Sequence, residues 1–387
     1  MAIAAVPPYL GNKFDGASPG LRFGMYLELW GQNEDRSMNW TTQDWRVETK
    51  GEDHQQRRVP SENKNSALQK AARLCENDRA LANALSARTR SLAKTWPTAD
   101  TILCVQAEAI APFTTGLGNE HPLENGFAFL NPYGLPYLPG SGIKGVLRHA
   151  ARELESGDWG EQRGWNKRAI DALFGRNAND ELERGALMFW DVIPKIRGDS
   201  LNVEVMTAHQ THYYQNKASP HDSGSPNPIF FLTVPPGSSF EFYVVCDRAR
   251  SERIAPELVG DHWKVLINAA LEHAFRWLGF GAKTAVGYGA MTSQTQLEAR
   301  KRAAREREGA EREATAVAWS GAQIKYNRAN KSVTVEKDGK SATAIHPKGE
   351  ELLNSLSPQT RRKVLDGQFV RVTAYVADRS LVRVSVS

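Results

Sequence analysis

Residues 135–155, LPYLPGSGIKGVLRHAARELE, carry an apolar stripe at helical spacing. Apolar residues recur there at intervals of three and four, as on one face of an α-helix: Ile143, Val146, Leu147, Ala150, Ala151 and Leu154. We predict an amphipathic helix with Ser141 as its N-cap. Lys144, Arg148 and Arg152 are each four residues apart, so they form a cationic ridge away from the apolar stripe.

A second apolar stripe predicts a helix over about residues 261–278, and we expect Gly279 to end it with a left-handed C-cap. Alternating or continuous apolar runs predict strands at residues 100–110 and 185–192, and a third strand that begins at residue 201. Two further runs on either side of the turn PPGS predict a hairpin over residues 229–247. The order of strand, helix, strand, strand, helix, strand indicates an α+β fold. We predict a ferredoxin-like, or RRM-like (βαββαβ), core with insertions.

The composition along the chain predicts four regions. Residues 1–99 form an irregular and helical N-terminal region that packs on the core, and residues 100–295 form the core domain. Residues 296–316 alternate basic and acidic side chains with alanine, which is typical of a solvated helical linker. Residues 317–387 form a small β-rich C-terminal module with a hairpin turn at EKDGK.

Net charge and cysteine content restrict the class of protein. The formal net charge is +5 and the pI is near 9.0, which suits a polyanionic partner. The three cysteines are far apart and form no C-x-x-C pair, so we expect no disulfide framework and no structural zinc site. We expect no other metal and no cofactor. No stretch resembles an export signal or a membrane span, so we expect a cytoplasmic protein with no membrane partner.

Gly140, Gly142 and Gly145 spell the G-x-G-x-x-G pattern of dinucleotide-binding proteins. A buried strand must run into that pattern, and the three prolines between residues 131 and 139 argue against one. Cations in the first turn of a helix instead favour phosphate at its N-terminus. A solvated basic face on an ordinary helix is the open alternative.

A second glycine cluster, GFGAKTAVGYG, spans residues 279–289. Its four glycines surround Lys283 and Thr284. Glycine has no side chain to pack, so a segment this rich in glycine is less stable. This is tolerated where another backbone approaches closely.

The two glycine clusters together resemble motifs of the RAMP superfamily of CRISPR effector proteins. PYLPGSGIKGVLR resembles the proline-glycine-serine, lysine-glycine, leucine-arginine motif, and GFGAKTAVGYG resembles the C-terminal glycine-rich loop. The order of segments over residues 100–292 is similar to that of a RAMP subunit of the type III-B (Cmr) complex. The resemblance does not include the C-terminal module.

This resemblance implies a non-catalytic backbone subunit that holds the 3′ part of a crRNA and caps the filament in antiviral defence. The implied partners are crRNA, a target RNA duplex in the assembled complex, and other Cmr-type backbone and small subunits. Phosphate contacts suit a variable guide, because they do not read bases. The implied RNA-binding residues are Gly140, Ser141, Gly142, Lys144, Arg148, Gly279, Gly281, Lys283 and Thr284, with Tyr288 as a stacking residue.

His209 and His212 are further candidates for RNA binding. They are three residues apart, as a metal pair could be, but no third ligand has a recognised spacing. Two tyrosines follow at once, so stacking on RNA or contact with a neighbouring subunit is an equal interpretation.

Two other functions stay open. A metal-independent endoribonuclease that processes precursor crRNA would use His149, His209 or His212 as general acid or base. Asp191 is an isolated carboxylate to consider for target cleavage, although its place at the end of an apolar strand favours a turn-capping role. The third interpretation is a scaffold protein with no RNA contact.

Overall fold

The computed structural model describes residues 2–11, 13–33, 35, 37–50, 55–159, 163–178, 181–208, 219, 227–378 and 380–385. The chain divides into two compact units, Met1–Gln294 and Thr295–Ser387. No helix among the described residues is both long and apolar enough to cross a membrane.

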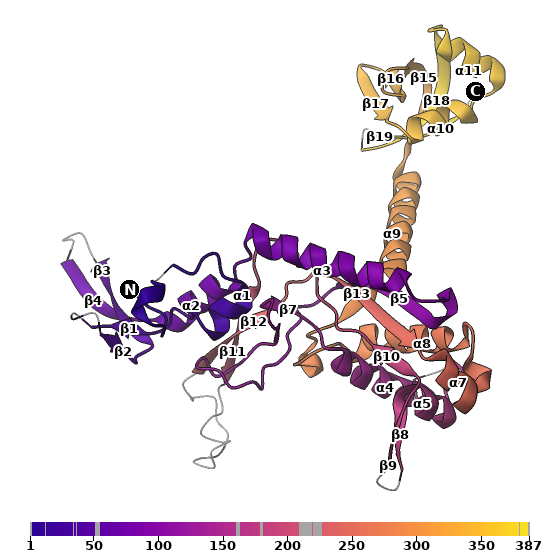
Figure 1. The fold of residues 1–387 in the computed structure, drawn as a ribbon. Coiled ribbons are helices and arrows are strands. Elements are labelled where there is room, and N and C mark those ends of the chain that lie inside the picture. The colour runs from indigo at the N-terminus through magenta and orange to yellow at the C-terminus, as the bar shows by residue number, and fades with distance from the viewer. Residues whose placement is uncertain are drawn as a thin grey trace. The chain divides into compact units, whose positions relative to one another are not determined.

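A four-stranded antiparallel sheet lies at the centre of the first unit (Figure 1). Its strands, from one edge to the other, are β10 (Leu187–Phe189), β13 (Ser239–Cys246), β5 (Ile102–Ala109) and β14 (Met291–Ser293). Helices α4 (Gly140–Ser156) and α8 (His262–His273) pack against each other and share the core of this sheet. Mixed α and β structure, predicted from the two periodicities, is therefore confirmed.

Helix α4 buries the predicted apolar stripe. Ile143, Leu147, Ala150, Ala151 and Leu154 are all buried, and Val146 packs beside them. The prediction that Ser141 caps this helix is wrong, because the helix begins at Gly140 and its N-cap is Pro139. Ser141 lies inside the first turn.

Helix α8 continues into a π-helical turn, η4 (Ala274–Leu278), and ends at Gly279. Gly279 has the expected positive φ of 70°, but its ψ of 169° is not that of a left-handed cap. The predicted type of cap is therefore wrong, since Gly279 has a positive φ without the ψ of the left-handed region.

The hairpin predicted over residues 229–247 is also wrong. Strand β12 (Asn227–Thr233) pairs with β11 (Asn202–Ala208), whereas β13 pairs with β5 and β10. Val234 forms a bridge with Phe113, and Ser239 forms one with Lys195, so the PPGS turn carries the chain from one sheet to another.

The first 99 residues contain more strand than their sequence indicates. Two hairpins form there, β1 with β2 and β3 with β4, and their mostly polar strands give only a short apolar alternation, at Trp45 and Val47. The elements are η1 (Pro8–Leu10), α1 (Pro19–Gly24), β1 (Gly31–Gln32), β2 (Met38–Asn39), β3 (Gln43–Lys50), β4 (Gln55–Glu62), α2 (Asn63–Ala72), α3 (Glu76–Lys94) and η2 (Ala99–Thr101).

Short elements complete the first unit. They are β6 (Phe129–Leu130), β7 (Leu135–Pro136), α5 (Lys167–Phe174), β8 (Gly175–Ala178), β9 (Glu181–Arg184), α7 (Arg248–Ile254), η3 (Pro256–Leu258) and η5 (Thr284–Val286).

The second unit is a small closed β-barrel with its own core. Its chain begins in α9 (Gln294–Thr315), which contains no buried residue among its described side chains. The barrel elements are β15 (Val317–Asn327), β16 (Ser332–Lys337), β17 (Lys340–Ala344), α10 (Lys348–Ser355), α11 (Pro358–Leu365), β18 (Val370–Ala377) and β19 (Ser380–Ser385). The predicted EKDGK turn joins β16 to β17 and is confirmed.

Candidate nucleic-acid interface

The N-terminus of α4 is held by a carboxylate from a distant part of the chain. Asp191, just beyond β10, accepts a hydrogen bond from the Gly140 N–H at 2.7 Å. A carboxylate there satisfies one free N–H group and lies favourably in the positive field of the helix end. Asp191 therefore does act as a cap, but of a distant helix and not of the turn after its own strand, as its sequence position predicted.

Three cations gather beside the first turns of α4. Burial lowers the pKa of Lys144, and the positive charges of Arg148 and Arg184 lower it further. Arg184 comes from the end of β9, so tertiary structure brings it to the helix. Within the described part of the chain, the buried Arg148 Nε has no hydrogen-bond partner. Like charges this close repel each other, and an anion placed among them would relieve that repulsion.

The three glycines of α4 have different environments. A Cβ on Gly140 would lie 2.1 Å from the Phe189 carbonyl oxygen, so packing inside the chain explains that glycine. Gly142 and Gly145 are exposed. A Cβ on Gly145 would meet no atom within 4 Å, and one on Gly142 only the end of Leu138 at 3.7 Å. Internal packing therefore does not account for these two.

Contacts inside the chain explain three glycines of the 279–289 loop, namely Gly279, Gly281 and Gly289. Phe280 N donates to Gly289 O at 3.0 Å, and Gly289 N donates to Pro112 O at 2.8 Å. A Cβ on Gly281 would lie 2.2 Å from Thr114 O, and one on Gly289 would lie 1.8 Å from Phe280 O. The close backbone approach expected of this cluster is thus made by the chain's own backbone.

Lys283 lies with a positive φ of 60° at the N-cap of η5. Its Nζ is 2.8 Å from the Met206 sulfur and 5.2 Å from the centre of the Phe231 ring. Tyr288 packs on the same Phe231 ring, with centroids 6.0 Å apart. Burial and the nearby Glu204 carboxylate raise the pKa of Tyr288.

The predicted residues therefore form two sets. Gly140, Ser141, Gly142, Lys144 and Arg148 lie on α4, and Gly279, Gly281, Lys283, Thr284 and Tyr288 lie on the loop. The contacts described for Lys144 and Lys283 involve different partners. His209 and His212 lie outside the described residues.

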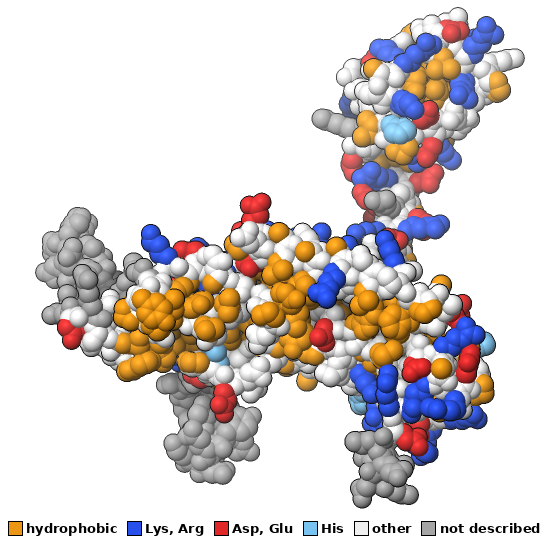
Figure 2. Space-filling view, in the orientation of Figure 1, with side chains coloured by type: hydrophobic (Ala, Val, Ile, Leu, Met, Phe, Trp, Pro, Cys, Tyr) orange, Lys and Arg blue, Asp and Glu red, His pale blue; other side chains and the backbone are white. Residues whose placement is uncertain are grey.

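The sequence did not indicate a basic groove next to the α4 cations. This hollow, of about 660 Å³, is lined by Lys167, Arg168, Arg176, Arg184 and Arg250, together with Asp171 and Glu183. Figure 2 shows Lys and Arg side chains concentrated on the region that α5 and α7 occupy in Figure 1. Glu183 neutralises Arg176 at 2.8 Å, and Glu257 pairs with Arg168 at 3.2 Å. These residues come from three separate segments, so spacing in the sequence could not reveal them.

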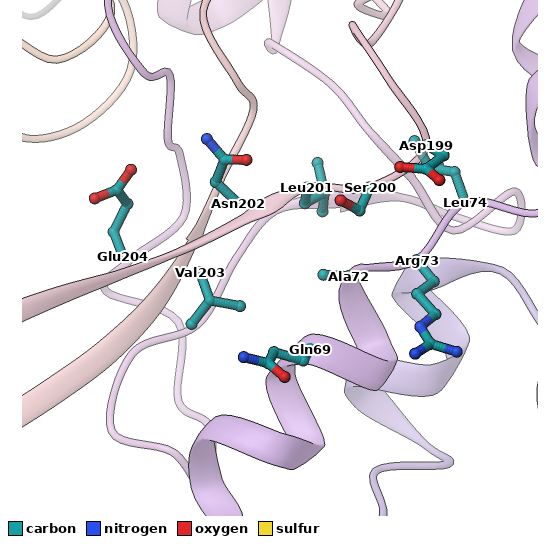
Figure 3. Close-up of a pocket in the computed structure, with 10 residues that line it drawn as sticks. All are labelled: Gln69, Ala72, Arg73, Leu74, Asp199, Ser200, Leu201, Asn202, Val203 and Glu204. Atoms are coloured by element: carbon teal, nitrogen blue, oxygen red, sulfur yellow. The ribbon is translucent and has the colours of Figure 1, made fainter.

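A second hollow, of about 720 Å³, lies between α2 and the start of β11 (Figure 3). Arg73, just after α2, lines it together with Asp199 and Glu204. Its charges are mixed, and it contains none of the residues predicted to bind RNA. This hollow does not suit a polyanion.

Two histidines share one carboxylate on the other side of α4. Glu153 lies 3.4 Å from the exposed His149 and 2.6 Å from the buried His273 of α8. Trp159 packs edge-on against His273. Among the described residues, no group of three or more His, Cys, Asp or Glu could hold a metal ion.

Comparison with known proteins adds independent information. The model of the RAMP superfamily matches residues 106–292. The chain is 30% identical to the CRISPR system Cmr subunit Cmr6 of Pyrococcus furiosus, over 45% of this chain and 63% of that protein. It is 29% identical to Cmr6 of Saccharolobus solfataricus, over 48% of this chain and 54% of that protein. The chain thus spans less than two thirds of either relative.

Two solved structures are also similar. One is the type III-B Cmr-beta complex bound to cognate target RNA, with 21% identity, a TM-score of 0.40, and 60% of this chain and 71% of that chain covered. The other is Cmr6 from Pyrococcus furiosus, with 26% identity, a TM-score of 0.28, and 50% and 97% covered. The matched residues 106–292 span β5, α4, β10, β13, α8 and the glycine-rich loop. The chain therefore contains a RAMP superfamily domain at residues 106–292.

Proposed function

We propose that this chain is a non-catalytic RNA-binding backbone subunit of a type III-B CRISPR effector complex. It holds the 3′ part of a crRNA through phosphate contacts and caps the filament beside other Cmr-type subunits. The similarity to two proteins named Cmr6 supports this proposal.

The observation that carries the proposal is the outer side of α4. Lys144, Arg148 and Arg184 crowd together there, and the exposed Gly145 follows Lys144 on the same helix. Cations hold phosphates, and glycine lets a sugar-phosphate backbone come close to a helix. Such contacts carry no sequence information, as a protein that accepts any guide requires.

We further propose that the core is ferredoxin-like. The four core strands follow one another along the chain as β5, β10, β13 and β14, and in the sheet the first lies between the third and fourth. Helix α4 lies between the first and second strands, and α8 between the third and fourth. This βαββαβ arrangement supports the assignment.

The test is the RNA that the chain retains when it is co-expressed with its genomic neighbours. We expect wild-type protein to retain RNA of uniform, repeat-derived character. The double variant Lys144→Glu/Arg148→Glu removes two cations from α4, so we expect it to lose the retained RNA. In binding assays, the slope of log affinity against log salt should fall by about 1.4, or roughly 0.7 per lost phosphate contact.

The matched control is Arg300→Glu/Lys301→Glu on the exposed helix α9, which makes the same change of charge elsewhere. This control should retain the RNA. If both double variants retain RNA equally, or if wild type retains none, the α4 site is refuted.

The shared carboxylate of His149 and His273 supports one alternative, an endoribonuclease with His149 as general acid or base. Incubation of the purified chain with precursor RNA separates the two functions. We expect no cleavage. Cleavage that is lost in His149→Ala would overturn the non-catalytic assignment.

A further inference from the structure

The C-terminal barrel carries all of the chain's excess positive charge. Residues 317–387 contain twelve Lys and Arg and only six Asp and Glu, whereas the whole chain has a net charge of +5. Residues 1–316 therefore have a net charge of −1. A polyanion would thus meet its strongest long-range attraction at this small module.

The topology of the barrel is that of a known nucleic-acid scaffold. The strands follow the order β15-β16-β17-β19-β18 and close through the pairing of β18 with β15. Only β17 and β19 are parallel, and the helices α10 and α11 lie between β17 and β18. This is the connectivity of an OB-fold, a five-stranded Greek-key barrel that often binds oligonucleotides. Fold alone does not establish function, so the surface must carry the argument.

One outer face of the barrel combines aromatic rings with cations. On β18, Val372, Ala374 and Val376 point into the core, so Arg371 and Tyr375 point outward. Arg383 of β19 lies directly opposite Tyr375, with its guanidinium 4.1 Å from the ring centre. Phe369, just before β18, lies 5.7 Å from the Arg371 guanidinium.

Phe369 and the two arginines of this face are available to a ligand. Phe369 is 64% exposed, so the core does not require it. Lys325 adds a further cation on β15, where it pairs with Glu336 at 2.6 Å. Within the described part of the chain, no carboxylate pairs with Arg371 or Arg383. We call Lys325, Phe369, Arg371, Tyr375 and Arg383 the Phe369 surface.

We propose that the Phe369 surface binds single-stranded nucleic acid. Unpaired bases stack on the Phe369 ring and on the guanidinium planes of Arg371 and Arg383, while the same two arginines attract the phosphates. Every base has a flat face, so such binding tolerates any sequence. A duplex hides those faces, so the surface prefers single strands. This site lies outside the RAMP domain and does not depend on the function proposed for it.

The test uses the full chain and a 12-nucleotide single strand with 2-aminopurine at its centre, as RNA in one arm and DNA in another. Stacking quenches 2-aminopurine fluorescence. We expect quenching with wild type and weaker binding of both an abasic strand and a duplex of the same length. Phe369→Ala should weaken binding of the base-containing strand about 5-fold or more and abolish the preference over the abasic strand.

Two further variants separate stacking from charge and from misfolding. The double variant Arg371→Gln/Arg383→Gln should reduce the slope of log affinity against log salt concentration by about 1.4. Ile345→Ala removes a side chain that is 69% exposed in the same unit, so it is the matched control and should bind as wild type. If Phe369→Ala and Ile345→Ala bind and quench alike, the Phe369 surface is not a stacking site and the proposal fails.

Each measurement is repeated in the Lys144→Glu/Arg148→Glu background to separate this site from the α4 site. In that background, Phe369→Ala should still weaken binding of the base-containing strand. If Lys144→Glu/Arg148→Glu weakens binding but Phe369→Ala does not, this proposal fails and the α4 proposal stands. The opposite pattern refutes the α4 site and supports the barrel.

Discussion

Asp191 accepts the Gly140 N–H at 2.7 Å and so joins the end of β10 to the start of α4 across 51 residues of sequence. A carboxylate beside an apolar strand could be read as a cleavage residue. Its contact with the helix end gives it a structural role instead. Its negative charge also reduces the attraction of this helix end for phosphate.

The first prediction concerns this cap. Asp191→Ala should lower the free energy of unfolding by about 1 kcal/mol, because Gly140 N–H loses its partner. Asp191→Asn keeps an acceptor and removes the charge, so it should cost less stability and should tighten RNA binding at low salt. Urea unfolding and RNA titration measure both effects. Equal RNA affinity in Asp191→Asn and wild type would show that phosphate does not approach this helix end.

Gly145 provides a test in which stability and binding change in opposite directions. Its exposed helical position has room for a Cβ, so Gly145→Ala should stabilise the free chain by about 1 kcal/mol. The methyl group should weaken RNA binding if a phosphate backbone lies against this face. The control is Gly309→Ala, another open helical glycine, which lies on α9. Gly309→Ala should stabilise the chain without changing RNA binding. Loss of RNA binding in both variants would contradict this account.

The glycine-rich loop gives a prediction about folding alone. Gly289 has φ +70°, and its Cβ would lie 1.8 Å from Phe280 O, whereas Gly287 has φ +92° with open space around it. Gly287→Ala should therefore cost about 1 kcal/mol of strain. Gly289→Ala should cost considerably more, because backbone must move. Thermal unfolding of the two variants measures the difference, and equal melting temperatures would contradict the packing described for this loop.

Because the pKa of Lys144 is lowered, we predict that RNA binding weakens at alkaline pH. Burial and two arginines lower the Lys144 pKa below its ordinary value of 10.5, and only the protonated amine attracts phosphate. As the pH rises, affinity should therefore begin to decline at a lower pH than it would for a lysine with the ordinary pKa of 10.5. Arg184→Gln removes one repelling charge and should shift this decline to higher pH. NMR titration of the lysine side chains would measure the pKa directly in both proteins.

Because the His121 ring is buried, we predict that the chain loses stability in mild acid. Burial lowers its pKa below the ordinary 6.5, although its contact with Phe23 O acts in the opposite direction. Its Nδ1 accepts from Leu123 N at 3.2 Å, so the folded chain favours the neutral ring. The unfolded state therefore binds a proton first, and stability should fall as the pH drops below 6.5. His121→Gln should flatten this dependence in denaturant titrations at pH 5 to 7.

Periodicity predicted those elements that bury one face. The stripe of α4 and the alternation at the end of β5, where Ala107 and Ala109 are buried, each follow from the side that meets the core. The pairing of β12 with β11 could not be predicted, because two apolar runs around a turn look alike whether they pair with each other or with distant strands. Arg184 was missed for a related reason: it reaches Lys144 through the fold, and residues 40 apart leave no periodic signal. The Asp191 contact is of the same kind.

Helix α9 has a consequence for how the protein can evolve. No described side chain in this helix is buried, and its own ion pairs, such as Arg302 with Glu306 and Arg312 with Glu308, lie on the surface. Neither hydrophobic core includes a residue from it. Recombination within this segment would therefore cut through neither hydrophobic core. The RAMP domain and the barrel could each be exchanged for another module at the level of the gene, without redesign of either interior.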